Sequence, residues 1–227
     1  DVIEAGGIEP PMSLAGEPTA WAVQHWMVAR HGETEWNRIG RRQGELDSPL
    51  TETGLIQASE LANAASMAGV DVIYSSPQGR AVGTARVIAA RLGVGMFTLE
   101  GLREVRHGKM AGLTDLEIRA KFPEAWAERD ADRAHWRFPQ GESYFDAAKR
   151  VSAALAEIDS MGYRRPLLVA HEMISRLIRG RLLGIPLEKA IELRGTQGSL
   201  EVLQPARSCE LEPESSAERE GRNDMAD

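Results

Sequence analysis

The chain has 227 residues, and its 42% of hydrophobic side chains is typical of a globular protein and excludes a disordered one. The formal net charge of −7 at pH 7 argues against a nucleic-acid partner, which needs a basic face. A single cysteine, Cys209, excludes an internal disulfide framework and any paired-cysteine metal or redox site.

The two ends of the chain differ in composition from the middle. Residues 1–20 hold several glycines and prolines without hydrophobic periodicity, and we expect an extended or flexible N-terminal arm. Residues 206–227 are acidic and contain few large apolar side chains, so they cannot offset the entropy lost on ordering, and we expect a disordered tail. One domain is therefore predicted over residues 21–205.

The sequence shows no sign of a membrane or secretory destination. Its longest apolar runs are far too short to span a bilayer, and the acidic N-terminus lacks the basic-then-apolar pattern of a signal peptide. We therefore expect a cytoplasmic protein without a membrane partner.

The first half of the predicted domain alternates strands with helices. Residues 26–29 have the continuous apolar character of a buried strand, and the alanine-rich residues 55–67 predict a helix. Residues 70–74 predict a second strand. Residues 80–92 predict a helix with one apolar face, and residues 95–99 a short third strand.

The second half returns to this rhythm after an interruption. Residues 143–161 predict a long helix with an apolar stripe, residues 167–170 a buried strand, and the following residues a helix that ends at about Leu183. Residues 197–203 predict a last strand. Residues 104–142, which interrupt the alternation of strands and helices, contain short helical segments, and we interpret them as an insertion.

Alternating strands and helices predict an α/β fold, in which a sheet is covered by helices on both faces. We expect a three-layer α/β/α sandwich with a mostly parallel central sheet. The insertion, with helical pieces at residues 115–121 and 124–129, is predicted to lie over the carboxyl ends of the strands.

Chemically active side chains follow four of the predicted strands. Arg30 and His31 follow the first, Arg80 lies one turn beyond the second, Glu104 follows the third and His171 follows the fourth. In open α/β sheets, ligands bind outside the carboxyl ends of the strands. The five side chains are therefore predicted to meet at one rim.

These residue types suit the transfer of a phosphoryl group through a phosphohistidine. A neutral imidazole is a competent nucleophile near pH 7, and guanidinium groups pair bidentately with phosphate oxygens. A leaving alkoxide needs a proton, which a carboxylic acid of raised pKa could donate before acting as base toward water. Because the arginines and the second histidine supply the positive charge, we expect no metal ion and no organic cofactor.

Five segments in this order closely resemble the histidine phosphatase superfamily, in its phosphoglycerate mutase-like branch. Each is short, but their common order makes the resemblance specific over about residues 26–186. They are Arg30-His31-Gly32-Glu33-Thr34 with Trp36-Asn37, Gln43-Gly44 and Asp47-Ser48-Pro49-Leu50-Thr51; Ser75-Ser76-Pro77 with Arg80-Ala81 and Thr84-Ala85; Leu102-Arg103-Glu104 with Gly108 and Gly112-Leu113-Thr114; Gly141-Glu142-Ser143; and Val169-Ala170-His171.

The resemblance implies a role for each of the five rim residues. By position, His31 is the nucleophile that becomes phosphorylated. Arg30, Arg80 and His171 hold the transferring phosphate, and Glu104 is the acid and then the base.

The resemblance also implies further contacts with the substrate, and the sequence differs from the family pattern at two places. Asn37 would add a neutral donor to the phosphate, and Gln43 and Gly44 are candidates for substrate binding. Glu172 stands where the family has a small residue; its carboxylate would repel a phosphate unless it turns away, pairs with Arg176 or contacts a polar or cationic part of the substrate. The segment Lys109-Met110-Ala111 replaces an aromatic and an acid of many relatives.

Several of these residues also have plain structural interpretations. Glu104 could be a surface carboxylate paired with Arg103 or Arg106, and Asn37 could be a turn residue. Three further histidines are expected to be structural or exposed to solvent: His25, His107 and His135.

Two other groups of side chains could reach the substrate. One set of basic residues could bind a second anionic group or form a solvated rim, and the two interpretations stay open: Arg38, Arg41, Arg42, Arg106 and Lys109. The tryptophans are expected to pack in the core or at the rim more often than to contact a ligand, and Trp36 and Trp136 are the two to examine near the pocket.

The leading hypothesis is a phosphomonoester hydrolase that acts on a small phosphorylated metabolite. A cofactor-dependent phosphoglycerate mutase is the alternative, although mutases carry a longer segment between the acid and the second histidine. A catalytically weak phosphate-binding scaffold is the alternative from another class, and Glu172 is the feature that favours it. The resemblance is also compatible with a homodimer.

Overall fold

The computed structural model describes residues 21–195 and 197–206. The predicted arm and all of the predicted tail except Ala206 lie outside these residues. The boundaries proposed for the domain, residues 21 and 205, stay predictions. Within the described part of the chain, no helix is long and apolar enough to cross a membrane.

A five-stranded sheet forms the centre of the molecule, with the strand order β3-β2-β4-β1-β5. Neighbouring strands pair in parallel from β3 to β1, and only β5 runs antiparallel to its neighbour β1. The predicted mostly parallel sheet is thus confirmed. The strands are β1 (Trp26–Arg30), β2 (Val72–Ser75), β3 (Gly95–Thr98), β4 (Pro166–Ala170) and β5 (Leu200–Leu203).

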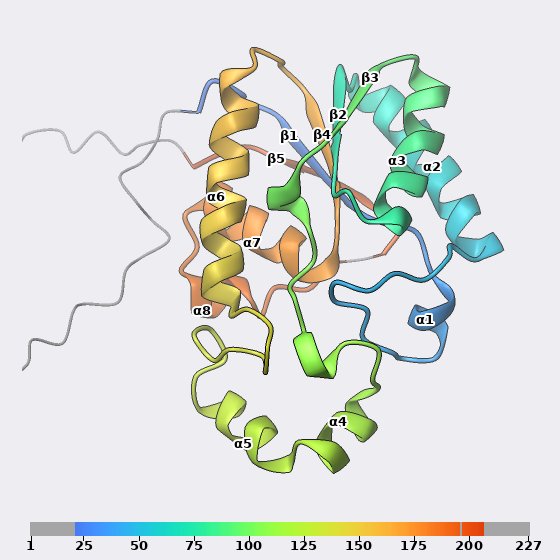
Figure 1. Ribbon diagram of the computed structural model, residues 1–227. Helices are drawn as coiled ribbons and strands as arrows, with labels where there is room; N and C mark the ends of the chain where they lie inside the picture. The colour runs from blue at the N-terminus through green and yellow to red at the C-terminus, as the bar shows by residue number, and fades with distance from the viewer. Residues whose placement is uncertain (1–20, 196, 207–227) are drawn as a thin grey trace, which may run out of the picture.

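Two layers of helices cover the sheet, as Figure 1 shows. On one face lie α2 (Glu52–Ala68) and α3 (Gly79–Leu92), and on the other lie α6 (Tyr144–Ser160) and α7 (Glu172–Leu183), with the short α8 (Leu187–Ala190) beside α7. The predicted three-layer architecture is therefore confirmed.

The helix ends follow local capping chemistry. Helix α2 begins at Glu52, three residues before the predicted start, because the Thr51 side chain accepts from the Gly54 N–H and caps it. Helix α6 begins after Ser143, which forms a capping box with Asp146.

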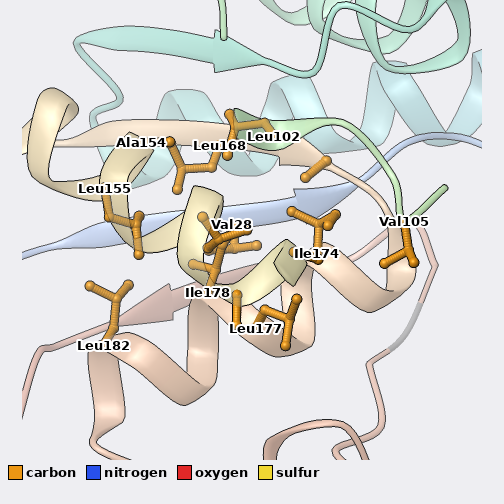
Figure 2. Close-up of a cluster of buried hydrophobic side chains, with 14 of the residues drawn as sticks. Val28, Leu102, Val105, Ala154, Leu155, Leu168, Ile174, Leu177, Ile178 and Leu182 are labelled. Carbon is orange, nitrogen blue, oxygen red and sulfur yellow. The ribbon is translucent and has the colours of Figure 1, made fainter. Parts of the chain in front are cut away.

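The larger core lies between the sheet and the face that carries α6 and α7. Figure 2 shows Val28 and Leu168 of the sheet among side chains of these helices. Leu155 of α6 is fully buried in this cluster. Leu102 and Val105, which also belong to it, anchor the segment that leads from β3 into the insertion.

The insertion lies beyond the edge where the parallel strands end, as predicted (Figure 1). Its regular elements are α4 (Asp115–Lys121) and α5 (Pro123–Ala131), preceded by the 3-10 turns η1 (Glu100–Leu102) and η2 (Gly108–Met110). The short helix α1 (Glu35–Arg38), which follows β1, lies near the same edge. The insertion is therefore placed to form one wall of a site at the carboxyl ends of the strands.

Truncation of Leu155 tests the core that holds this architecture. Leu155→Ala should lower the free energy of unfolding by about 2–5 kcal/mol, because a fully buried leucine leaves a cavity that the surroundings fill only in part. Leu116→Ala is the matched control, since Leu116 is 80% exposed, and should change it by less than about 0.5 kcal/mol. Urea denaturation measures both, and equal effects would contradict this account of the core.

Candidate active site

The two predicted site histidines lie side by side because they follow neighbouring parallel strands in register. Arg30, the last residue of β1, pairs with Ala170, the last residue of β4, and the His31 N–H donates to the Ala170 carbonyl at 3.0 Å. The next residue of each strand therefore leaves the sheet at the same level. The ring centroids of His31 and His171 are 5.2 Å apart.

A hydrogen bond to the next residue fixes the tautomer of His31. Its Nδ1 lies 2.7 Å from the Gly32 carbonyl oxygen, which can only accept, so the proton is on Nδ1 and Nε2 keeps its lone pair. The Gly32 N–H donates to Thr84 Oγ1 at 3.0 Å and holds this peptide in place. Position 32 requires glycine, since a Cβ there would lie 2.3 Å from the Gly54 carbonyl oxygen.

The electrostatic surroundings keep both imidazoles neutral at pH 7. Burial lowers the pKa of His31 well below its usual value, and the charges of Arg80 and Arg30 lower it further against the opposing hydrogen bond to Gly32. Burial and the charge of Arg80 likewise lower the pKa of His171. A neutral ring is the form of His31 that can act as a nucleophile.

Arg80 is a buried cation held by three oxygen atoms of one loop. It lies in the first turn of α3 and is 2% exposed. Its Nη1 donates to the Leu46 carbonyl at 2.7 Å and to Asp47 Oδ1 at 2.9 Å, and its Nη2 donates to the Gly44 carbonyl at 3.0 Å. The positive N-terminal end of a helix gives a cation no electrostatic benefit. A bound anion would therefore stabilise both the Arg80 guanidinium and the N-terminus of α3.

Glu172 pairs with two arginines at the start of α7. Its Oε2 lies 3.0 Å from Arg30 Nη1, and its Oε1 accepts from Arg176 one turn further along the helix. The pairing with Arg176 is one of the arrangements considered from the sequence. It partly neutralises the carboxylate that stands beside the predicted phosphate position.

Gln78, which sequence reasoning missed, connects three parts of the site. His171 Nε2 lies 2.8 Å from Ser76 Oγ, which accepts from the Gln78 N–H at 3.3 Å. The Gln78 side chain accepts from the Glu104 N–H at 2.7 Å and donates to the Gly44 carbonyl at 2.8 Å. The available signal in the sequence was only a polar side chain at the start of a helix.

Glu104 projects into the site from a segment anchored by its neighbours. Leu102 and Val105 are fully buried on either side of it (Figure 2). Burial raises the pKa of Glu104, although the hydrogen bond from the Val105 N–H and the charges of Arg80 and Arg30 oppose this shift. The carboxyl therefore keeps its proton to a higher pH than an exposed glutamate does.

The alternative interpretation of Glu104 as a surface ion-pair residue is wrong. Arg103 pairs with Glu100 instead, and within the described residues no ion pair joins Glu104 to Arg106. The Arg106 N–H donates to Glu142 Oε1. Glu104 is thus free to face the site.

The neutral candidates combine structural contacts with access to the site. Asn37 Oδ1 accepts from the Thr34 N–H at 3.1 Å and caps α1, which agrees with a turn role. Gln43 Nε2 donates to Thr34 Oγ1 at 2.8 Å. Gly44 has a φ of +53°, and a Cβ there would lie 3.0 Å from the His107 ring, so glycine leaves room for that histidine.

These groups line a cavity of about 360 Å³, a size that suits a small metabolite. Eight of the nine candidate site residues contribute to its wall: Arg30, His31, Asn37, Gln43, Gly44, Arg80, Glu104 and Glu172. The ninth, His171, is fully buried behind this wall and contacts the ring of His31.

The surroundings of the site agree with the expectations only in part. His107 is buried and packs against Phe138 with ring centroids 4.5 Å apart, as a structural histidine does, but it also lines the cavity. Burial and the nearby arginines lower its pKa to about 3. Neither Trp36 nor Trp136 lines the cavity; the relevant indole is Trp126, which contacts arginines of the cavity wall.

Two of the additional basic residues, Arg41 and Arg42, line the cavity, whereas Arg38, Arg106 and Lys109 do not. Besides Arg30 and Arg80, three arginines outside that set also line it: Arg129, Arg133 and Arg176. Over residues 21–195 and 197–206, no group of three or more His, Cys, Asp or Glu side chains is arranged to hold a metal ion.

Comparison with known sequences identifies the family. The model of the histidine phosphatase superfamily (branch 1) matches residues 26–211. The probable phosphoglycerate mutase GpmB of Proteus mirabilis is 37% identical over 171 residues, which cover 74% of this chain and 79% of that protein. The protein of the same name from Yersinia pestis is 36% identical over 169 residues, covering 74% and 78%.

Solved structures with phosphatase names share the fold. A mycobacterial glucosyl-3-phosphoglycerate phosphatase, solved with VO3, superposes with a TM-score of 0.74 at 31% identity and covers 80% of this chain and 93% of its own. A putative alpha-ribazole-5'-P phosphatase from Escherichia coli superposes with a TM-score of 0.74 at 25% identity, covering 79% and 89%. With the matched sequence segments and the paired histidines, these similarities lead to one conclusion: the chain belongs to the histidine phosphatase superfamily, branch 1.

Proposed function

We propose that the protein is a phosphomonoester hydrolase that acts on a small phosphorylated metabolite through a phosphohistidine intermediate on His31. The observation that carries this proposal is the His31 ring itself, which is neutral, buried and hydrogen-bonded through Nδ1. Its Nε2 lone pair lies in a cavity wall that also holds Arg30, Arg80 and Glu104.

In the first step, His31 Nε2 attacks phosphorus while the bond from phosphorus to the leaving oxygen breaks. Arg30 and Arg80 stabilise the charge on the equatorial oxygens, as guanidinium groups do in phosphoryl transfer. Glu104 gives its proton to the leaving oxygen, which departs as an alcohol. The proton on Nδ1 of His31 remains with the Gly32 carbonyl hydrogen bond.

His171 takes part as a hydrogen-bond donor in this scheme. The single proton of the Ser76 hydroxyl can go to His171 Nε2 at 2.8 Å or to Gln78 Oε1 at 3.3 Å, and donation over the shorter distance places the ring proton of His171 on Nδ1. This Nδ1 is buried and has no partner among the described residues. It is therefore available to a phosphoryl oxygen.

In the second step, water attacks the phosphohistidine and the Glu104 carboxylate takes its proton. The bond between phosphorus and Nε2 of His31 breaks, inorganic phosphate leaves, and both side chains return to their starting states. The two arginines and His171 supply the positive charge throughout, so the scheme needs no metal ion.

Two further expectations stay predictions. The relatives described above are bacterial proteins, and a cytoplasmic location is consistent with them. A homodimer is proposed only from the family resemblance.

A phosphoglycerate mutase is the second candidate, because curated relatives carry that name. A mutase returns the phosphate from the histidine to a bound acceptor, whereas a phosphatase gives it to water. Incubation with 3-phosphoglycerate, with and without bisphosphoglycerate, separates the two. Release of inorganic phosphate supports the hydrolase, and bisphosphoglycerate-dependent formation of 2-phosphoglycerate without release supports the mutase.

Removal of the nucleophile tests whether the site is catalytic at all. His31→Ala should lower phosphate release from p-nitrophenyl phosphate by a factor on the order of 10⁴–10⁶, the range expected when a covalent nucleophile is lost. Mass spectrometry of the quenched enzyme should also lose the phosphorylated species. His135→Ala is the control, since His135 is exposed and lies outside the cavity wall. A phosphorylated His31→Ala enzyme, or none in the wild type, would exclude this mechanism and favour the scaffold.

The role of Glu104 predicts a dependence on the leaving group. Glu104→Gln should lower kcat/KM for an alkyl phosphate by about 10²–10⁴ and for p-nitrophenyl phosphate far less, because the latter leaving group needs no proton. Equal losses on both substrates would show that Glu104 is not the acid.

The same residue predicts the pH profile. Since only the protonated carboxyl can donate, kcat/KM for the alkyl phosphate should fall as the pH rises through the raised pKa of Glu104. This descending limb should be absent in Glu104→Gln. If kcat/KM of Glu104→Gln still falls over the same pH range, a group other than Glu104 is responsible for the fall.

The position of Glu172 predicts weaker binding of phosphate than the arginines alone would give. Glu172 occupies part of the Arg30 fork, so Glu172→Gln should lower the inhibition constant of inorganic phosphate about five- to tenfold, a change of about 1 kcal/mol. Glu188→Gln, an exposed acid on α8, should leave it unchanged. Weaker phosphate binding in Glu172→Gln would instead make Glu172 a residue that positions Arg30.

A further inference from the structure

Side chains hold the backbone of the segment that carries Glu104. This segment, residues 101–106, leaves the turn η1 and continues without regular secondary structure. Its last three N–H groups donate to side-chain oxygens, those of Gln78, Glu104 itself and Glu142. Backbone outside helices and strands keeps a fixed position only if other groups satisfy its N–H and C=O groups. The carbonyl groups of the segment therefore need donors of their own.

Arg150 of α6 supplies these donors. Its Nη1 donates to the carbonyl oxygens of Gly101 and Arg103, both at 2.8 Å, and its Nη2 donates to that of Glu104 at 3.3 Å. Its other N–H groups bind Glu142: Nε donates to Oε2 at 3.2 Å and Nη2 to Oε1 at 2.7 Å. A guanidinium group has five N–H donors, and these five hydrogen bonds use all of them.

Glu142 holds the far end of the same segment. Its Oε1 accepts from the Arg106 N–H at 2.9 Å, and its own N–H donates to the Arg106 carbonyl at 3.0 Å. Position 141 requires glycine, because a Cβ there would lie 2.2 Å from the Arg106 carbonyl oxygen. The segment Gly141-Glu142-Ser143, on which the family resemblance partly rests, thus acts on the residues beside Glu104.

Close packing against α6 brings the segment within reach of Arg150. A Cβ at Gly101 would lie 2.6 Å from Ala154 Cβ, so glycine lets the chain lie directly on the helix. Leu102 and Ala154 are buried in the same core cluster (Figure 2). Arg150 lies in the second turn of α6 and therefore has a fixed base.

The carboxyl group of Glu104 follows the position of this backbone. Its Oε1 accepts from the Val105 N–H at 2.9 Å, which ties the side chain to the segment that bears it. Arg150 and Glu142 do not line the cavity. They can therefore affect a reaction in the cavity only through the residues that they hold.

The pairing with Glu142 limits the effect of Arg150 on the charge of the acid. Burial raises the pKa of Glu104, and the charge of Arg150 is among the weaker influences that lower it. Because a Glu142 oxygen lies 2.7 Å from Arg150 Nη2, the carboxylate offsets much of this charge. The pair thus orders the backbone around Glu104 while it opposes retention of the proton only weakly.

We propose that Arg150 and Glu142 are positioning residues for Glu104, which fix the backbone of residues 101–106 so that the carboxyl group meets the leaving oxygen of the substrate. The inference rests on the proposed function and deepens it, since it identifies what holds the general acid. A misplacement of about 1 Å can lower a rate on the order of 100-fold. Loss of the pair should therefore impair protonation of the leaving oxygen more than attack on phosphorus.

Two aryl esters of similar size test this role. Phenyl phosphate lacks the nitro group of p-nitrophenyl phosphate, and its more basic leaving group depends more on an acid. Arg150→Met should lower kcat/KM on the order of 10- to 100-fold for phenyl phosphate, but less than about threefold for p-nitrophenyl phosphate. Equal losses on both esters, or no loss on either, in a variant that circular dichroism shows to be folded would overturn the proposal.

Further variants separate the geometry of the fork from its charge. Arg150→Lys keeps the charge but lacks the planar fork, and should show most of the same selective loss. Glu142→Gln keeps an acceptor for the Arg106 N–H and should show a smaller one. Lys149→Met is the matched control, because Lys149 is the exposed cation next to Arg150 on α6, and both rates should stay unchanged. Wild-type rates in Arg150→Lys would contradict positioning by the fork.

Combination with Glu104→Gln separates this proposal from the proposed function. If Arg150 acts through Glu104, adding Arg150→Met to Glu104→Gln should lower kcat/KM for phenyl phosphate no further. A selective loss in Glu104→Gln, followed by a full second loss in the double variant, would refute only the positioning role. Equal losses on both esters in Glu104→Gln would refute the acid itself.

Hydrogen exchange measures the positioning without any substrate. In Arg150→Met, the amides of residues 104–106 should exchange about tenfold faster or more than in the wild type, whereas those of β1 and β4 should not change. Unchanged exchange in residues 104–106 would overturn the proposal even if Glu104 is the acid.

Discussion

The hydrogen bond between His31 Nδ1 and the Gly32 carbonyl is the interaction on which the chemistry of this site depends. It places the proton on one nitrogen and leaves the lone pair on the other. The bond exists because glycine at position 32 lets the backbone lie close to the Gly54 carbonyl, and because Thr84 accepts from the Gly32 N–H. Packing of three distant segments thus sets the tautomer of one ring.

Charge balance is the second constraint. A cavity with seven arginines in an acidic chain is stable only if most of these cations have partners, and six of them pair with carboxylates. A bound phosphate therefore competes with protein carboxylates as well as with water. At Arg30, the competing carboxylate is that of Glu172. Glu172 departs from the family pattern, and this departure therefore affects how strongly the site binds phosphate.

The sequence predicted the rim of the sheet well because parallel strands deliver their last residues to one edge. Arg30, His31 and His171 needed only the strand order and register to meet. The wall formed by the insertion was not predictable in the same way. Arg129 and Trp126 reach the cavity through packing of short helices that no strand register constrains, and His107 through stacking on Phe138. Gln78 was missed because its contacts join segments far apart in the sequence.

The nitrogen that carries phosphorus tests the central claim most directly. Glu104→Gln, mixed with p-nitrophenyl phosphate, should form the phosphoenzyme and hydrolyse it slowly, because it lacks the base for water. Nuclear magnetic resonance of the trapped, denatured enzyme then distinguishes the two phosphohistidine isomers. The account predicts phosphorus on Nε2 of His31; phosphorus on Nδ1, or on another residue, would contradict it.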